Sequence, residues 1–144
     1  MPAQVFTPVL VATHNSSAAF FTVGAAASAE LQTLAETGNV MDVQDSGGLH
    51  GPGNTGGVVV TGSDTFNWVS LAAMLIPTND AFVSARTTLP AAGEVKVLYA
   101  YAYDAGTEVT NAWRPSSSTI DSARPGPAVT CSRERSPVRL TSTP

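Results

Sequence analysis

Residues 95–103 read Val-Lys-Val-Leu-Tyr-Ala-Tyr-Ala-Tyr, a stretch in which β-branched and aromatic residues occupy every second position. Successive side chains of an extended strand point to opposite faces, so the odd-numbered positions form one strongly apolar, aromatic face. The pattern predicts a β-strand. We expect its tyrosines to pack in a core or between two sheets, and the alternative is that one or more of them line a ligand surface.

Further strands are predicted on the N-terminal side of this stretch. Residues 57–61 and 65–76 are rich in Val, Phe, Trp and other apolar residues, and turn residues separate them. The opening segment, residues 5–13, is also rich in β-branched residues, but Pro8 interrupts it. This suits an edge strand, because proline cannot donate to a strand ladder. Several short strands of this kind imply a β-sandwich or a barrel.

One segment has a helical pattern instead. Between Ala25 and Gly38, Ser28 is suited to cap the start of a helix and Gly38 is placed to end it. Apolar residues recur between these two positions at helical spacing: Leu31, Leu34 and Ala35. We therefore expect one short helix of about ten residues that lies against the sheet.

The composition is that of a folded protein with little charge. Of the 144 residues, 43% are hydrophobic and 12% are charged, which argues against general disorder and suits one ordinary domain. A formal net charge of −4 gives no cationic surface for a polyanion, so nucleic acid is not an expected partner. No apolar run is long enough to span a membrane, and no signal peptide is recognised at the start.

The charge is unevenly distributed along the chain. Residues 1–123 carry ten acidic and three basic side chains, whereas residues 124–144 carry one acidic and four basic side chains. The second segment is also rich in Pro, Ser and Thr, so it can bury little apolar surface. We therefore predict a β-sandwich domain over residues 1–123 and an irregular Pro/Ser/Arg-rich tail over residues 124–144.

Two acidic turns are the strongest candidates for a binding site. Asp80 follows the apolar run that ends at Ile76, and Asp104 and Glu108 follow the tyrosine-rich strand. Loops at strand ends can converge at one end of a sandwich, which would bring these three carboxylates together. Oxygen ligands on loops suit calcium, which takes about 6 to 8 oxygens. The alternative is that the acidic residues only cap ordinary turns.

The sequence gives no positive sign of catalysis. His14 and His50, the two histidines, lie in separate predicted loops and lack the spacing of a metalloprotease pair. The nucleophile motif Gly-x-Ser-x-Gly is absent, and the single cysteine, Cys131, supplies neither an intrachain disulfide nor a structural zinc site. We therefore predict a protein that is not an enzyme. A hydrolase would have to use Asp80, Asp104 or His14.

Several blocks of the sequence resemble bacterial spondin-domain proteins. The match covers roughly residues 4–111, and its distinctive parts are Met-Leu-Ile-Pro-Thr-Asn-Asp-Ala-Phe at 74–82 and Tyr-Asp-Ala-Gly-Thr-Glu at 103–108. Two further blocks occur in the order seen in that family, Thr-Pro-Val-Leu-Val-Ala-Thr-His-Asn at 7–15 and Leu-Ala-Glu-Thr-Gly at 34–38. The resemblance implies an antiparallel β-sandwich similar to a calcium-binding C2 domain, with one short α-helix.

The same resemblance implies a function and a metal site. Spondin domains occur in extracellular matrix proteins, and their animal members act in cell adhesion. Their calcium site lies in acidic loops, which carries over to Asp80 and, in the second block, to Asp104 or Glu108. The expected protein is secreted, binds calcium and contacts a partner in the extracellular matrix or on a cell surface. The chain departs from the family by starting late, so the family's first strand is expected to be missing.

Two functions follow as predictions. The leading one is a non-enzymatic extracellular adhesion or binding module of the spondin type, with calcium in a structural role. The second is a structural, self-assembling extracellular protein of a filament or matrix, in which the acidic loops are ordinary turns. A missing edge strand would leave unpaired N–H and C=O groups that another chain can complete, which predicts homo-oligomers formed by strand addition.

Overall fold

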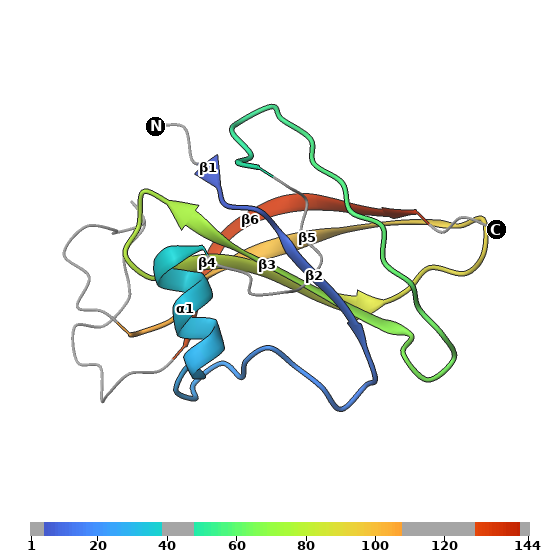
Figure 1. The fold of residues 1–144 in the computed structure, drawn as a ribbon, viewed down its shortest axis with the longest axis horizontal. Helices are drawn as coiled ribbons and strands as arrows, with labels where there is room; N and C mark the ends of the chain where they lie inside the picture. Colours follow the sequence, from blue (N-terminus) through green and yellow to red (C-terminus); the bar gives the residue numbers. More distant parts are fainter. Residues whose placement is uncertain (1–4, 39–47, 108–128, 142–144) are drawn as a thin grey trace.

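The computed structural model describes residues 5–38, 48–107 and 129–141. Within these ranges the chain forms one antiparallel six-stranded sheet, curled into a half-barrel, and one short helix (Figure 1). The predicted mainly β fold with a single short helix is confirmed in this form. The elements are β1 (Val5–Phe6), β2 (Leu10–His14), α1 (Ala29–Thr37), β3 (Trp68–Ile76), β4 (Ala81–Thr88), β5 (Val95–Asp104) and β6 (Thr130–Thr141).

Among the described strands, β3 pairs with the largest number of others, namely β1, β2 and β4. Strands β4, β5 and β6 follow on one side as successive antiparallel neighbours, whereas β1 and β2 both pair with β3 on its other side. Val5 lies opposite Ile76 and Leu10 lies opposite Ala72, so β1 and β2 follow β3 as one interrupted strand. Pro8 lies at the interruption, which agrees with the predicted edge position of this segment.

The helix forms where the sequence predicts it. The Ser28 hydroxyl oxygen accepts a hydrogen bond from the Leu31 N–H over 3.2 Å and caps the helix. Gly38 adopts a left-handed conformation with φ of 70°, and its N–H donates to the Leu34 carbonyl oxygen over 2.9 Å. The buried face, which includes Leu31 and Leu34, lies against β3 and β4 (Figure 1).

Alternate residues of β3 enter two hydrophobic clusters on opposite faces of the sheet. Leu71 and Leu75 belong to the first cluster, together with residues of β2, β4 and β5. Ala72 belongs to the second cluster, in which helix α1 packs near Phe82. Strand β3 is therefore buried on both faces, which explains why its sequence is an almost continuous apolar run.

Strand β5 is turned the opposite way from the prediction over most of its length. Ala100 and Ala102 are buried in the first cluster, whereas side chains of the other face are 41–63% exposed: Val95, Val97, Tyr99 and Tyr101. The prediction that the tyrosines pack in the core is therefore wrong for Tyr99 and Tyr101. An apolar pattern does not say which face of a strand is covered, and here the covered face is the one with small alanines.

Strand β6 lies within the segment 124–144, for which the composition predicts an irregular tail. Residues 130–141 pair with β5 along its whole length, with one irregularity in register. Val138 and Leu140 pack against the first cluster. The composition misses this strand because an edge strand with one solvated face needs few apolar residues.

The start of β6 is held by the N-terminal part of the chain. Val129 is fully buried and exchanges two backbone hydrogen bonds with the segment before the helix. The Gly24 N–H donates to the Val129 carbonyl oxygen, and the Val129 N–H donates to the Ala25 carbonyl oxygen, both over 2.8 Å. Residues more than one hundred positions apart in the sequence are thus tied together.

Candidate functional site

The two acidic turns lie at the same end of the sheet. The turn between β3 and β4 ends at Asp80, and the turn after β5 begins at Asp104, which lies opposite Ala81 on β4. The Ala105 N–H donates to the Asp80 carbonyl oxygen over 3.0 Å, and the Thr107 N–H donates to Asp80 Oδ2 over 2.9 Å. The structure therefore brings Asp80 into direct contact with the second turn.

Asp80 is fully buried, with an exposed fraction of 0%. Removing a carboxylate from water costs free energy unless hydrogen-bond donors or a cation compensate for the lost solvation. The Thr107 N–H is one such donor, and the Thr107 hydroxyl lies 3.5 Å from the same carboxylate oxygen. The Asp80 side chain therefore fixes the second turn against the first.

Asp104 stabilises the second turn through a hydrogen bond inside that turn. Its Oδ1 accepts a hydrogen bond from the Gly106 N–H over 2.7 Å, which is the geometry of an Asx turn. Gly106 has a φ of 70°, a left-handed conformation that glycine adopts without steric cost. The turn-capping interpretation of Asp104 is thus correct, whether or not the side chain also binds a ligand.

The chemistry of these side chains suits calcium, although the described residues give only part of a site. Asp80 and Asp104 are carboxylates on adjacent turns, and calcium prefers such oxygen ligands. Glu108 lies outside the described residues. In the described ranges, no group of three or more His, Cys, Asp and Glu side chains is arranged to hold a metal ion. A complete calcium site would need Glu108 or further oxygens from the same two turns.

A second candidate region, which the sequence did not indicate, is a cleft on the helix-bearing face of the sheet. It has a volume of about 200 Å³ and is lined by three aromatic and three polar side chains: Phe20, Phe21, Tyr103, Ser70, Ser84 and Arg86. Ser70 lies directly opposite Arg86 in the β3–β4 register, and Ser84 is two residues before Arg86 on β4. The three polar side chains therefore share one face.

His14 supports the floor of this cleft. It is the last residue of β2, so the prediction that it lies in a loop is wrong. Its Nε2 lies 2.7 Å from the Ser70 hydroxyl oxygen, and its Nδ1 lies 2.7 Å from the Asn15 carbonyl oxygen. A carbonyl oxygen only accepts, so Nδ1 carries the proton, and in the neutral imidazole the Ser70 hydroxyl donates to Nε2.

Arg86 provides the positive charge of the cleft. Its Nη2 donates to the Ser16 carbonyl oxygen over 2.6 Å, and its guanidinium carbon lies 4.1 Å from the centroid of the Trp68 ring. The Asn15 side chain fixes this acceptor by taking hydrogen bonds from the N–H groups of Ser17 and Ala18. No ion pair between Arg86 and a carboxylate occurs in the part of the chain that the structure describes.

The aromatic side of the cleft is a packed cluster. The ring centroids of Phe21 and Tyr103 are 4.7 Å apart, those of Phe21 and Phe82 are 5.1 Å apart, and both contacts are edge-on. Burial raises the pKa of the Tyr103 phenol, and the neighbouring Cys131 adds to this effect. The cluster therefore presents a rigid, neutral wall to the cleft at physiological pH.

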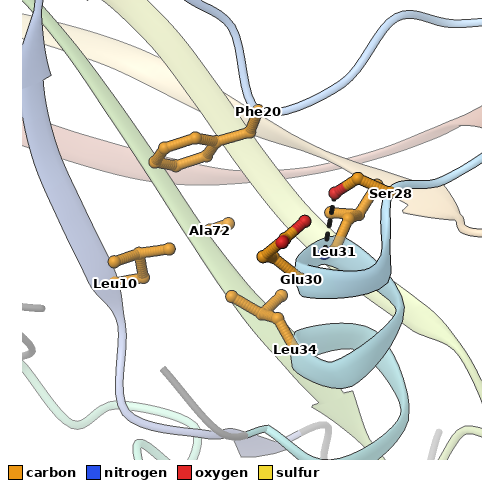
Figure 2. A pocket seen from close by; sticks show the side chains of 7 residues that line it. All are labelled: Leu10, Phe20, Ser28, Glu30, Leu31, Leu34 and Ala72. Atoms are coloured by element: carbon orange, nitrogen blue, oxygen red, sulfur yellow. Dashed lines mark hydrogen bonds between the residues drawn. The ribbon is translucent and has the colours of Figure 1, made fainter. Parts of the chain in front are cut away.

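A smaller apolar pocket of about 80 Å³ lies beside the cleft, between β2 and α1 (Figure 2). Leu10, Leu31 and Leu34 line it, and Phe20 lines both the pocket and the cleft. Glu30 lies at the pocket in the first turn of α1. The pKa of Glu30 is lowered mainly by a hydrogen bond with the backbone, and to a smaller extent by a hydrogen bond with the Ser28 side chain.

Comparison with known proteins adds no assignment to these sites. No family model matches the chain, and no curated protein matches it in sequence. Over the described ranges, no helix combines the length and apolar character that a membrane crossing requires. Function therefore has to be argued from the sites themselves.

Proposed function

We propose that this protein is a non-enzymatic, extracellular binding module of the spondin type, on a sheet that belongs to a C2-like β-sandwich. The observation that carries the proposal is the exposed apolar face of β5, here called the β5 stripe: Val95, Val97, Tyr99 and Tyr101. Contiguous exposed apolar side chains on a folded domain mark interaction surfaces. The partner we propose is a protein of the extracellular matrix or of a cell surface.

The β5 stripe has the properties of a protein-binding surface. Tyr99 and Tyr101 are 47% and 41% exposed, so each ring has large apolar area to lose from water when a partner docks. Tyrosine gives much contact area for little lost side-chain entropy, and its hydroxyl can bond at the rim of an interface. The side chains stand on a hydrogen-bonded strand between β4 and β6, which holds them in place before binding.

The proposed function also includes a calcium ion bound at the two acidic turns. Asp80 and Asp104, together with Glu108, would hold the ion, and the ion would compensate negative charge at the end of the sheet. The support for this is the hydrogen-bonded contact between Asp80 and the second turn, which places acidic side chains of both turns at one end of β4 and β5. A bound ion would brace these turns, as the Asp80–Thr107 hydrogen bond already does.

The calcium part predicts a ligand-dependent stability. Adding calcium to the chelator-treated protein is expected to raise its melting temperature, with about 2.7 kcal/mol of stabilisation at a concentration of one hundred times the Kd. Asp104→Asn and Glu108→Gln should each abolish this gain. Thermal melting at a series of calcium concentrations provides the measurement, with Asp64→Asn as a control that removes an exposed carboxylate elsewhere. A melting curve that does not respond to calcium would remove the metal from the proposal.

The binding part predicts a loss of adhesion. The double variant Tyr99→Ser, Tyr101→Ser is expected to weaken attachment of cells to a surface coated with the protein by about tenfold or more, since buried interface tyrosines commonly contribute more than about 1 kcal/mol each. Val59→Ser is the matched control, because Val59 is 87% exposed but lies in a loop far from β5 in the sequence. Equal attachment by the double variant and the control would contradict the proposal.

A self-assembling structural protein is the second candidate function, and two observations favour it. Strand β6 is the last strand in the order, so no strand among the described residues pairs with its outer edge. Such an edge can pair with a strand of another chain. The β5 stripe could also be covered by a second copy. Sedimentation velocity over a range of protein concentrations separates the candidates, because self-assembly predicts growing oligomers that the tyrosine double variant reduces, and a module for another protein predicts a constant size.

A further inference from the structure

The floor of the cleft presents hydrogen-bond acceptors. Ser70 and Ser84 are only 2% and 5% exposed. The Ser84 hydroxyl donates to the Leu71 carbonyl oxygen over 2.7 Å, and the Ser70 hydroxyl donates to Nε2 of His14 in the tautomer whose proton is on Nδ1. Since each hydroxyl proton is directed into the protein, each serine oxygen can offer a lone pair to the cleft. A ligand that fits this floor carries an N–H or O–H donor.

Arg86 adds a hydrogen-bonding cation beside these acceptors. A guanidinium has five N–H donors in a planar fork, and one of those of Arg86 is used by Ser16. Contact with the Trp68 ring and this hydrogen bond fix the plane of the fork. Because residues 1–123 carry only three basic side chains against ten acidic ones, Arg86 is a local positive site on a negatively charged chain. Its geometry suits a carboxylate.

The aromatic wall and the size of the cleft complete the description of a ligand. Phe20, Phe21 and Tyr103 line the same cleft as the polar floor and offer an apolar surface. A volume of about 200 Å³ lies below the range of about 300–1,000 Å³ that is typical of sites for drug-sized ligands. The cleft therefore suits a molecule, or the end of a chain, about as large as one amino-acid residue.

We propose that this cleft binds a carboxylate whose adjacent carbon carries an N–H or O–H donor and an apolar side group. Arg86 holds the carboxylate, the oxygens of Ser70 and Ser84 accept from the donor, and the aromatic wall covers the apolar group. This is the chemistry of an α-amino acid, an α-hydroxy acid or the C-terminal residue of a peptide. The inference does not depend on the proposed adhesion function.

A series of related probes tests the proposal on the full chain by calorimetric titration. Phenylalanine, phenyllactate and N-acetylphenylalanine each combine the carboxylate with an adjacent donor and should bind at millimolar concentration. Phenylpropionate lacks the donor and should bind roughly threefold to tenfold more weakly than phenyllactate. Phenethylamine lacks the carboxylate and should bind at least about tenfold more weakly than phenylalanine. Tighter binding of N-acetylphenylalanine than of phenylalanine would identify a peptide terminus as the source, and the reverse would identify a free amino acid.

Substitutions assign the interactions to residues. Arg86→Gln is expected to weaken phenyllactate binding about tenfold or more, whereas Arg139→Gln, which removes an exposed charge on β6, should leave it unchanged. Arg86→Lys should weaken binding less than Arg86→Gln, because it keeps the charge but not the fork. Ser84→Ala should reduce the difference in affinity between phenyllactate and phenylpropionate. Unchanged thermal melting of Arg86→Gln shows that the fold is intact.

Three results would overturn the proposal. The first is that none of the five probes binds to the intact chain at millimolar concentration. The second is that phenethylamine binds as tightly as phenylalanine, which would make the aromatic wall the whole site. The third is that Arg86→Gln and Arg139→Gln have the same affinity for phenyllactate. Failure of the adhesion proposal would appear separately, in the attachment of the Tyr99 and Tyr101 variant.

Discussion

Phe82→Ala is expected to lower the free energy of unfolding by about 3–5 kcal/mol, which is the usual cost of removing a buried phenylalanine ring. Phe82 is 0% exposed and is among the largest fully buried side chains in the described part of the chain. Its ring stacks on Tyr103 at 5.5 Å between centroids and meets the edge of Phe21 at 5.1 Å. The substitution would leave a cavity inside the second cluster, to which both Phe82 and the buried face of α1 belong.

Urea denaturation, monitored by tryptophan fluorescence, measures this loss of stability. Phe66→Ala is the matched control, because Phe66 is 48% exposed and its loss should change stability by only about 0.5 kcal/mol or less. A domain of this kind has about 5–15 kcal/mol of stability in total, so Phe82→Ala should remove a large part of it. Similar losses in both variants would show that the second cluster does not carry the stability assigned to it.

Gly38→Ala should destabilise the protein by about 2–5 kcal/mol, the combined cost of a left-handed backbone and a steric clash. Gly38 has a φ of 70°, and a Cβ placed there would clash with Thr7 Cγ2. Thr7 cannot move freely, because it is buried and its hydroxyl oxygen accepts a hydrogen bond from the Met74 N–H over 2.9 Å. The end of the helix is thus pressed against the segment that joins β1 to β2.

Gly53→Ala separates the two costs. Gly53 has a φ of 80°, and a Cβ placed there has no atom within 4 Å, so this variant should show only the backbone cost of about 1–2 kcal/mol. Thermal and urea denaturation of both variants give the comparison. If Gly38→Ala were no more destabilising than Gly53→Ala, the close approach of the helix end to Thr7 would be contradicted.

The helix could be predicted almost to the residue because its signals are local. The Ser28 cap, the glycine stop and the apolar spacing all act within one or two turns of the chain. The strand predicted over residues 57–61 does not form, although Val58 and Val60 pack against the first cluster. The strands around residues 68–76 and 95–104 are predicted correctly, since β-branched and aromatic residues favour extended backbone. Their arrangement into one curled sheet is not, because layering depends on contacts between distant segments.

Strands β5 and β6 show where residue type misleads. The side chains of β5 alternate between two faces as predicted. However, most of the larger apolar side chains lie on the exposed face, and Ala100 and Ala102 are buried. The Pro, Ser and Arg content of strand β6 predicts an irregular tail, yet pairing with β5 supplies its backbone hydrogen bonds. Neither outcome could be obtained without knowing which neighbours each strand has.

The two sites differ in how far the sequence indicated them. Asp80 and Asp104 were candidates because each follows a predicted strand, and the pairing of β4 with β5 brings their turns together. The cleft was missed because its residues come from separate strands and one loop. A usable signal was present, since Ser70 interrupts an apolar run and Ser84 and Arg86 recur at alternate positions of the next strand.

The backbone hydrogen bonds of Val129 have a consequence for synthesis on the ribosome. The hydrogen bonds that join Val129 to Gly24 and Ala25, and the pairing of β5 with β6, can form only after residues 129–141 have been translated and have left the exit tunnel. At about 5–20 residues per second, the nascent chain waits for seconds with the edge of β5 uncovered. A shortened chain that ends before Val129 should therefore need chaperones and aggregate, because it exposes a tyrosine- and valine-rich strand edge.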